Sequence, residues 1–336
     1  MDIGANSKRR YLYHRRRPIL LHRVTPSAEP IKAPMKTIQP DYYEDFHCAA
    51  DRCAHSCCVG WEIDIDEDTF AYYSRMDGKI GEELRKNIST DPLPHFILEG
   101  GERCPFLENS GLCRLILTLG EDSLCDICRE HPRFYNEFSD RTEAGLGMCC
   151  EEAVSLLLNG RKALNLVCLD DGTEEEPGTE EERLFKQREE IFSLLSRETV
   201  PLRSCMEDCA SLCGVGMPRL DMVYWADFYM GLERLDPAWT KALILLKSGG
   251  REWDVSRALC GVQYRRVMEY FVYRHFAAAG SFERAADMLR FSILSTLIVC
   301  RLENLGMELK DALRLYSSEI EYSDENIDLI LNKIRE

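Results

Sequence analysis

The amino-acid sequence predicts a mainly α-helical protein, with a cysteine-rich N-terminal domain of irregular loops followed by an all-helical C-terminal domain. Ten of the sixteen cysteines lie between Cys48 and Cys150, where short apolar segments alternate with Cys, Gly and Pro. After residue 183, apolar residues instead recur at the three- and four-residue spacing of amphipathic helices. A chain of 336 residues is long enough for two domains that each bury a core.

Composition divides the chain into four expected segments. Residues 1–34 form an Arg-rich start that we expect to be disordered or an upstream extension, because the amino-acid composition changes at Met35. Residues 35–169 form the cysteine-rich domain, and the acidic residues 170–182 form a linker or exposed loop with almost nothing apolar to bury. Residues 183–336 form the helical domain, and Ser323 before two acidic residues predicts the cap of its last helix. Helical spacing recurs in Leu184–Leu195, Met222–Leu235, Trp239–Leu246, Val267–Ala278, Ala285–Leu305 and Ile327–Ile334.

Charge and hydropathy disfavour several classes of protein. A net charge of -16 disfavours binding to nucleic acid and suits a basic or lysine-bearing partner. No apolar run reaches the roughly 18 to 20 residues of a membrane helix, and the start lacks the regions of a secretory signal. We therefore expect a cytoplasmic protein without a membrane partner, whose cysteines are reduced thiols or metal thiolates.

The cysteines form two dense groups. The first places four thiols within eleven residues, and its adjacent pair implies a turn, which Gly60 would permit. The second contains a C-x2-C pair, a standard chelating step because its turn brings two sulfurs to one metal. With His131 nearby, this density predicts a metal site. The candidate ligands are Cys48, Cys53, Cys57, Cys58, Cys104, Cys113, Cys125, Cys128 and Cys150.

The identity of the metal and several cysteines stay open at this point. Four thiolates serve a tetrahedral zinc or a 4Fe-4S cluster equally well, and nine or ten cysteines exceed one such site. Either two sites exist or several cysteines pack in the core. Three further cysteines are each separated by three residues, a spacing that would place them on one face of a helix. We expect them in the core, with a second metal site as the alternative: Cys205, Cys209 and Cys213. Isolated cysteines in apolar contexts are expected as small buried hydrophobes: Cys168, Cys260 and Cys300.

The order of the motifs resembles a known family. Phe46–Asp66 (FHCAADRCAHSCCVGWEIDID) contains a Cys, a second Cys, a Cys pair, Gly-Trp and Ile-Asp. Cys104-Pro-Phe-Leu, Gly-Leu-Cys113, Leu-Cys125, Cys128-Arg and Cys150-Glu-Glu-Ala follow, and Tyr316–Asn326 (YSSEIEYSDEN) resembles a closing motif. The chain is thus similar to the flagellin lysine-N-methylases (FliB-like), which are related to cysteine-rich zinc- or iron-chelating domains. The likeness spans residues 35 to about 334 and departs at His131, in place of Tyr, and at Glu151, in place of Pro.

The resemblance implies transfer of a methyl group from S-adenosylmethionine to lysine side chains of flagellin, with an associated 4Fe-4S cluster. A lysine amine, with an unperturbed pKa of about 10.4, must lose its proton before it can attack the methyl group. Four carboxylates flank the cysteine motifs and are candidates for that role, with a surface or capping residue as the alternative for each: Asp64, Asp66, Glu121 and Glu152. No glycine-rich strand-to-helix loop is present, so the sequence does not place the S-adenosylmethionine site. The alternative is a non-catalytic interaction module that binds zinc or iron.

Overall fold

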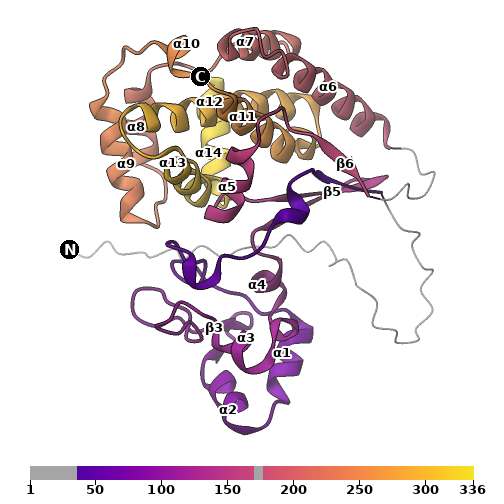
Figure 1. Ribbon diagram of the computed structural model, residues 1–336, viewed down its shortest axis with the longest axis vertical. Helices are drawn as coiled ribbons and strands as arrows, with labels where there is room; N and C mark the ends of the chain where they lie inside the picture. The colour runs from indigo at the N-terminus through magenta and orange to yellow at the C-terminus, as the bar shows by residue number, and fades with distance from the viewer. Residues whose placement is uncertain (1–35, 170–176) are drawn as a thin grey trace. The chain divides into compact units, whose positions relative to one another are not determined.

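The computed structural model describes residues 36–169 and 177–336 (Figure 1). Within these residues it contains fourteen α-helices, which confirms the prediction of a mainly α-helical protein. The chain folds into two compact units, which we describe separately: residues 49–131, and residues 36–48 together with 132–336. The expected basic start, 1–34, lies outside the described residues.

The unit of residues 49–131 is built from short elements joined by irregular loops. Its small core gathers bulky side chains from several of these elements, among them Tyr73, Phe96 and Phe106. The elements in chain order are η2 (Ala50–Arg52), α1 (Glu67–Ser74), α2 (Gly78–Lys86), β2 (Ile88–Ser89), β3 (His95–Phe96), α3 (Arg114–Leu119), η3 (Glu121–Ser123) and α4 (Asp126–Glu130).

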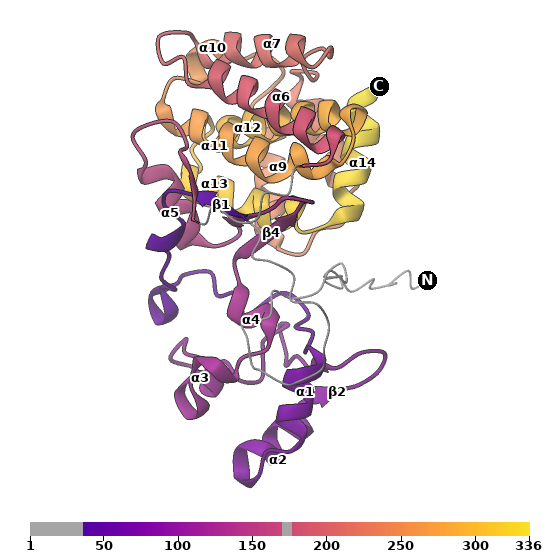
Figure 2. The same cartoon turned by 90° about the vertical axis from the view of Figure 1, so that its right-hand side faces the viewer.

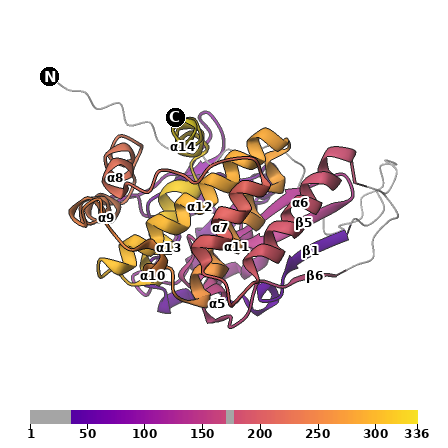
Figure 3. The same cartoon turned by 90° about the horizontal axis from the view of Figure 1, so that it is seen from above.

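The other unit contains a four-stranded sheet that the sequence did not predict. Its strands are β1 (Lys36–Pro40), β4 (Arg133–Glu137), β5 (Arg141–Leu146) and β6 (Leu166–Cys168), in the order β4-β5-β1-β6. Strand β1 runs parallel to β5 and antiparallel to β6. Figure 3 shows β5, β1 and β6 next to one another in this order. The strands escaped prediction because they are short, and because β1 pairs with a strand about a hundred residues away.

Every described element from α6 onward is helical, as expected for residues 183–336. Helix α12 is buried over most of its length and packs against α11 (Figures 1 and 2). No helix among the described residues is long and apolar enough to cross a membrane. The remaining elements of this unit are η1 (Tyr43–Asp45), α5 (Glu151–Asn159), α6 (Thr179–Leu195), α7 (Leu202–Leu212), α8 (Met222–Met230), α9 (Pro237–Ser248), α10 (Val255–Ala258), α11 (Val262–His275), η4 (Ala277–Ala279), α12 (Phe282–Asn304), α13 (Leu309–Tyr316), the π-helical turn η5 (Ser317–Glu321) and α14 (Asp324–Arg335).

The acidic stretch 170–182 does not coincide with the boundary between the units. Residues 170–176 lie outside the described residues, and Thr179–Glu182 form the first turn of α6. Three glutamates suit this position because carboxylates stabilise the positive end of a helix dipole. The units meet along the chain at Cys48–Ala49 and His131–Pro132 instead, because residues 132–169 contribute strands to the larger unit.

The isolated cysteines only partly follow expectation. Cys300 is fully buried on α12, as predicted for a small hydrophobe. Cys168 and Cys260 are exposed, so the expectation of burial was wrong for both. Cys168 ends the edge strand β6, and Cys260 follows the short helix α10 in a turn, where neither residue is covered by a second layer. The helix stripe lies in the core as expected, with two members buried and one half-buried: Cys205, Cys209 and Cys213.

Candidate metal centre

Five thiols gather in the unit of residues 49–131. All five belong to its small core, where two are buried and three are half-buried beside residues such as Phe106. They come from separate motifs of the sequence, and the negative charge that each would carry as a thiolate raises the pKa of others in the set. These core thiols are Cys58, Cys104, Cys113, Cys125 and Cys128.

Helix starts and turns position three of the core thiols. Cys113 and Cys125 directly precede α3 and α4 and occupy their N-cap positions. Burial raises the pKa of Cys113 and Cys104, whereas the nearby backbone N–H groups of Ile116 and Leu115 lower that of Cys113, and the N–H of Phe106 lowers that of Cys104. Backbone amides directed at sulfur are a common feature of thiolate metal sites. Local backbone geometry thus presents these sulfurs as acceptors.

Protonation of the core thiols depends on burial and on one another. Burial raises the pKa of Cys104 to about 12, and it raises the pKa of Cys113 as well. A hydrogen bond with Cys125, together with burial, raises the pKa of Cys128. Cys58 differs, because a hydrogen bond from Cys57 and the nearby charge of Arg103 lower its pKa to about 7 despite burial. Several thiolates in this core therefore require a cation that compensates their charge.

The chemistry of these donors fits a soft metal, since thiolates are the preferred ligands of zinc and of iron–sulfur clusters. Within the part of the chain that the structure describes, no three His, Cys, Asp or Glu side chains are already arranged to hold a metal ion. A metal would thus require the core thiols to turn toward a common centre. The structure brings candidate donors together without selecting four of them.

The other four candidate cysteines lie outside this core cluster. Cys53 and Cys57 belong to the same unit, and the Cys53 thiol donates to the carbonyl oxygen of His55 at 3.3 Å. Cys48 and Cys150 belong to the larger unit, where burial and, to a smaller extent, the charge of Cys48 raise the pKa of Cys150. Cys150 occupies the N-cap position of α5, as Cys113 does on α3. The nine candidates therefore divide into seven residues on one unit and two on the other.

Of the four candidate carboxylates, Asp66 has the most defined contacts. One oxygen accepts the backbone N–H of Thr69 and caps α1, and the other accepts the N–H of Asp126 at the start of α4, each at 2.9 Å. Asp66 thus joins two helix starts beside the C-x2-C pair. Glu121 is exposed at the start of η3, and Asp64 forms a backbone bridge with His95.

Glu152, the fourth candidate, lies in the first turn of α5 on the larger unit. Three of the four carboxylates therefore belong to the unit of residues 49–131 and one to the larger unit, and Asp66 is the candidate whose side-chain hydrogen bonds are described above.

The chain is similar to a curated flagellar protein and to curated lysine methylases. It is 29% identical over 137 residues to the flagellar biosynthetic protein FliU of Salmonella muenchen, a match that covers 38% of this chain and 80% of that protein. It is also 29% identical over 143 residues to a lysine-N-methylase of Salmonella choleraesuis and to one of Salmonella typhimurium. The resemblance to the FliB-like flagellin lysine methylases is confirmed.

The similarity to these lysine methylases is partial. The matched region covers 38% of this chain and spans about a third of the length of each lysine-N-methylase, 34%. No family model matches the chain, and no solved structure matches it.

Residues that sequence reasoning did not select surround the core thiols. Burial raises the pKa of Tyr73, and so do the nearby charges of three of these cysteines, while its hydroxyl donates to the carbonyl oxygen of Ser123 at 2.6 Å. Arg103 donates to the carbonyl oxygens of Leu107 and Glu108, at 2.9 and 2.6 Å. Arg103 directly precedes Cys104 in the sequence, and this position is the signal by which Arg103 could have been selected.

Burial also affects His131, one of the two positions at which we expect the chain to depart from the methylase pattern. Desolvation lowers the pKa of His131 to about 4, so the imidazole is neutral at physiological pH. Its ring lies 5.5 Å from that of Trp61, centroid to centroid, and the Trp61 indole donates to the carbonyl oxygen of Cys57. An aromatic contact therefore links the end of this unit to the Cys57–Cys58 turn.

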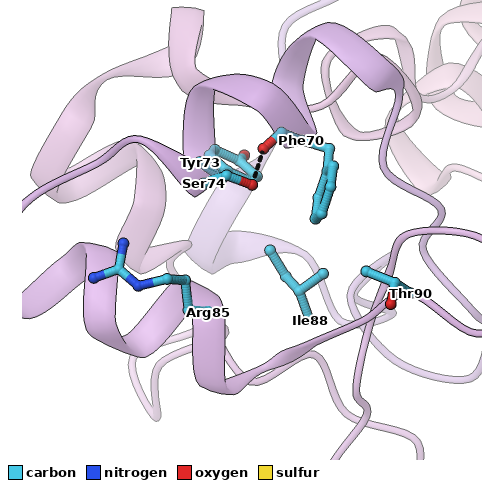
Figure 4. Close-up of a pocket in the computed structure, with 6 residues that line it drawn as sticks. All are labelled: Phe70, Tyr73, Ser74, Arg85, Ile88 and Thr90. Atoms are coloured by element: carbon cyan, nitrogen blue, oxygen red, sulfur yellow. Dashed lines mark hydrogen bonds between the residues drawn. The ribbon is translucent and has the colours of Figure 1, made fainter.

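Tyr73 also lines a small cavity of about 150 Å³ in the same unit (Figure 4). The hydroxyl of Ser74 donates to the carbonyl oxygen of Phe70 at 2.7 Å on its wall. Pockets for cofactors typically measure about 300 to 1,000 Å³, so this cavity is too small for a nucleoside cofactor. The other lining residues are Arg85, Ile88 and Thr90.

The segment Tyr316–Asn326, which the sequence resemblance marks as a closing motif, contributes buried contacts to the helical unit. It spans the π-helical turn η5 and the start of α14. The buried carboxylate of Glu321 accepts hydrogen bonds from Tyr270 at 3.0 Å and pairs with His275 at 2.7 Å. Glu319 accepts the backbone N–H groups that precede α9, at 2.8 and 3.0 Å. These contacts give the motif a packing role, because each carboxylate satisfies groups from other helices.

Proposed function

We propose that this protein is an S-adenosylmethionine-dependent protein-lysine N-methyltransferase that acts on flagellin and holds a 4Fe-4S cluster. The observation that carries the proposal is the similarity to proteins named lysine-N-methylase, which agrees with the motif order in the sequence. The FliU relative supports a flagellar substrate. The gathering of five thiols in one core supports the cluster, and zinc is the alternative metal.

The core thiols would supply the cluster ligands. When bound, the cluster would supply cationic charge that compensates the thiolates, together with redox-active iron. Asp66 would position one pair of ligands, because it fixes the start of α4 between Cys125 and Cys128. Tyr73 and Phe106 would limit access of water to the sulfurs, since both side chains are almost fully buried beside them.

The acceptor lysine must reach the methyl donor as a neutral amine. At pH 7 only about one lysine amine in 2,500 is unprotonated, given an ordinary pKa of about 10.4. A carboxylate or a desolvated position near the acceptor would remove that proton. Among the four candidates, Glu121 is the exposed one on the cysteine-rich unit, and we assign it first for testing. The acidic chain, with a net charge of -16, would attract a lysine-bearing partner.

The test uses the full chain, purified without oxygen and incubated with S-adenosylmethionine and flagellin. Mass spectrometry of flagellin peptides should show methylated lysines, and a brown colour with acid-labile sulfide should identify an iron–sulfur cluster. Glu121→Gln should lower kcat if Glu121 is the base, whereas the neighbouring Asp122→Asn serves as the matched control on the same exposed turn. Unmodified flagellin in the presence of metal-loaded protein would contradict the proposed activity.

The runner-up is a non-catalytic module that binds zinc or iron. One observation favours this second function: both side-chain oxygens of Asp66 are engaged in structural hydrogen bonds at the starts of α1 and α4. It predicts a stoichiometric metal with no transfer of methyl groups to flagellin lysines. A colourless protein with bound zinc and no transfer would support it.

A further inference from the structure

The larger unit contains a second and much larger pocket, of about 650 Å³. This volume lies within the range of about 300 to 1,000 Å³ that is usual for small-molecule sites. Three segments form it: the residue that follows β1, the loop between α5 and β6, and the turn after α6. The lining residues are Asp41, Lys162, Ala163, Leu164, Asn165, Ser196 and Glu198.

Buried charged residues of α11 hold the first wall of this pocket. The guanidinium of Arg266 donates to the carbonyl oxygens of Leu157 and Lys162, at 2.5 and 2.7 Å. The carboxylate of Glu269 accepts the backbone N–H of Leu164 at 2.7 Å. Arg266 and Glu269 are only 3% and 1% exposed. The backbone N–H of Asp41 also donates to the carbonyl of Asn165 at 2.9 Å, which ties this loop to the end of β1.

The neighbouring residue on α11 holds the second wall. Arg265, also buried, donates to the carbonyl oxygens of Leu195 and Val200. These two residues bracket the turn that carries Ser196 and Glu198. A single stretch of α11 therefore fixes the main chain on both sides of the pocket.

Holding these two loops with buried charged side chains costs free energy that a purely structural contact could avoid. Burial of a charged side chain is unfavourable unless hydrogen bonds compensate it, and apolar residues would close a surface loop without that cost. Here three buried charged side chains bind main-chain groups of the two loops that line one pocket. Loops held in this way are preorganised, which lowers the entropy cost of binding a ligand.

The lining of the pocket indicates the class of ligand. Asp41 and Glu198 offer carboxylates for an ammonium group or a ribose diol, while Lys162 offers a cation for a carboxylate. Asn165 and Ser196 add neutral donors and acceptors that suit a nucleobase edge. A ligand with only a positive charge, such as a lysine side chain, would be repelled by Lys162. Mixed charge therefore favours a zwitterion.

We infer that this pocket binds an amino-acid-bearing nucleoside, the chemical class to which S-adenosylmethionine belongs. The inference rests on the proposed function for the identity of the ligand, and it gives the methyl donor a site that the sequence did not place. The ammonium and ribose hydroxyls of the ligand would face Asp41 and Glu198, and its carboxylate would face Lys162.

The test measures binding of S-adenosylhomocysteine, which lacks the reactive methyl group, to the full metal-containing chain by isothermal titration calorimetry. Glu198→Gln and Lys162→Met should each weaken binding about tenfold, the effect of one lost charged hydrogen bond. Both side chains are exposed, so the fold should tolerate these changes. Glu207→Gln, an exposed residue of α7 outside the pocket, is the control and should change binding by less than about twofold.

The outcomes separate this inference from the proposed activity. A wild-type protein that binds the probe and methylates flagellin, with both pocket variants binding like the control, would overturn the site and leave the activity. Tighter binding of a lysine-bearing peptide to Lys162→Met, with no change for the nucleoside, would assign the pocket to the acceptor and overturn the inference. Weaker binding of the nucleoside by both variants supports the site even where flagellin stays unmodified. Absence of both binding and transfer in wild-type protein would overturn both proposals.

Discussion

The double contact of Asp66 gives the sharpest prediction. Its two oxygens cap α1 through Thr69 and anchor α4 through Asp126, and both hydrogen bonds are 2.9 Å long. Loss of a helix N-cap costs about 1 kcal/mol, with a range of about 0.5 to 2. Asp66→Ala removes both acceptors, so we expect it to lower the free energy of unfolding of residues 49–131 by about 2 kcal/mol. Asp66→Asn keeps one side-chain oxygen and should lose about half of that amount.

The assay can report on this unit alone. Trp61 is the only tryptophan among residues 49–131, so its fluorescence, isolated by replacing the other three tryptophans with Phe, follows this unit. Hydrogen exchange of peptides from α1 and α4 should accelerate in Asp66→Ala and stay unchanged in peptides from α12. Asp68→Ala, an exposed carboxylate in the same first turn of α1, is the matched control. Equal unfolding energies for Asp66→Ala and Asp68→Ala would refute the reasoning.

Three further predictions concern the metal content of cysteine variants, the pH dependence of stability at Glu321, and the packing of Gly147 against Tyr322. Cys125→Ser should lower the metal content per chain because serine is a harder donor, whereas Cys300→Ala should retain full metal and cost about 1 kcal/mol; equal metal content in both would contradict the ligand assignment. Burial alone would raise the pKa of Glu321, yet the charge of Arg274 and the hydrogen bond of His275 hold it below its ordinary value. The stability that this carboxylate contributes is therefore fully present above its unfolded pKa of about 4.3, and it is lost as the pH falls through the lower folded pKa. Glu321→Gln removes this titration, so the free energy of unfolding of the variant should fall less steeply as the pH is lowered. A Cβ at Gly147 would overlap the hydroxyl of Tyr322, so Gly147→Ala should cost about 1 to 3 kcal/mol in thermal unfolding, and adding Tyr322→Phe should recover part of that loss.

Local sequence patterns predicted the helical part of the fold well. Helical spacing placed α6, α8, α9, α11, α12 and α14, since apolar periodicity reflects burial on one face. Ser323 caps α14 as predicted, because its hydroxyl accepts the backbone N–H of Asn326 at 3.2 Å. The end of the second segment was less accurate: the pattern continued to Leu235, whereas α8 ends at Met230 before Gly231.

The sheet and the boundary between the units depend on distant pairing and were not predictable in this way. Lys36 pairs with Arg141, and no local pattern records a partner so far along the chain. The acidic stretch looked like a boundary because it is polar, but polarity alone does not show which unit the flanking strands join. Residues 132–169 join the larger unit through the sheet.

The candidate sites, too, could be predicted from the sequence only in part. Dense cysteine spacing predicted where thiols would gather, and five of the nine candidates lie in one core. The exact set depends on loop geometry, which placed Cys48 and Cys150 on the other unit. The pocket of that unit had no sequence signal, because Arg265, Arg266 and Glu269 resemble an ordinary solvated helix face until their main-chain partners are known.

The parallel pairing of β1 with β5 has a consequence for biosynthesis. Strand β1 leaves the ribosome early, but its parallel partner, Arg141–Leu146, is synthesised only after the whole of residues 49–131. The order of translation therefore gives the cysteine-rich unit time to fold, and to take up any metal, while the first strand of the larger unit still lacks that partner. Slow folding of residues 49–131 would prolong exposure of an unpaired strand, the kind of edge that promotes aggregation. The folding rate of this unit would then affect the yield of the larger unit as well.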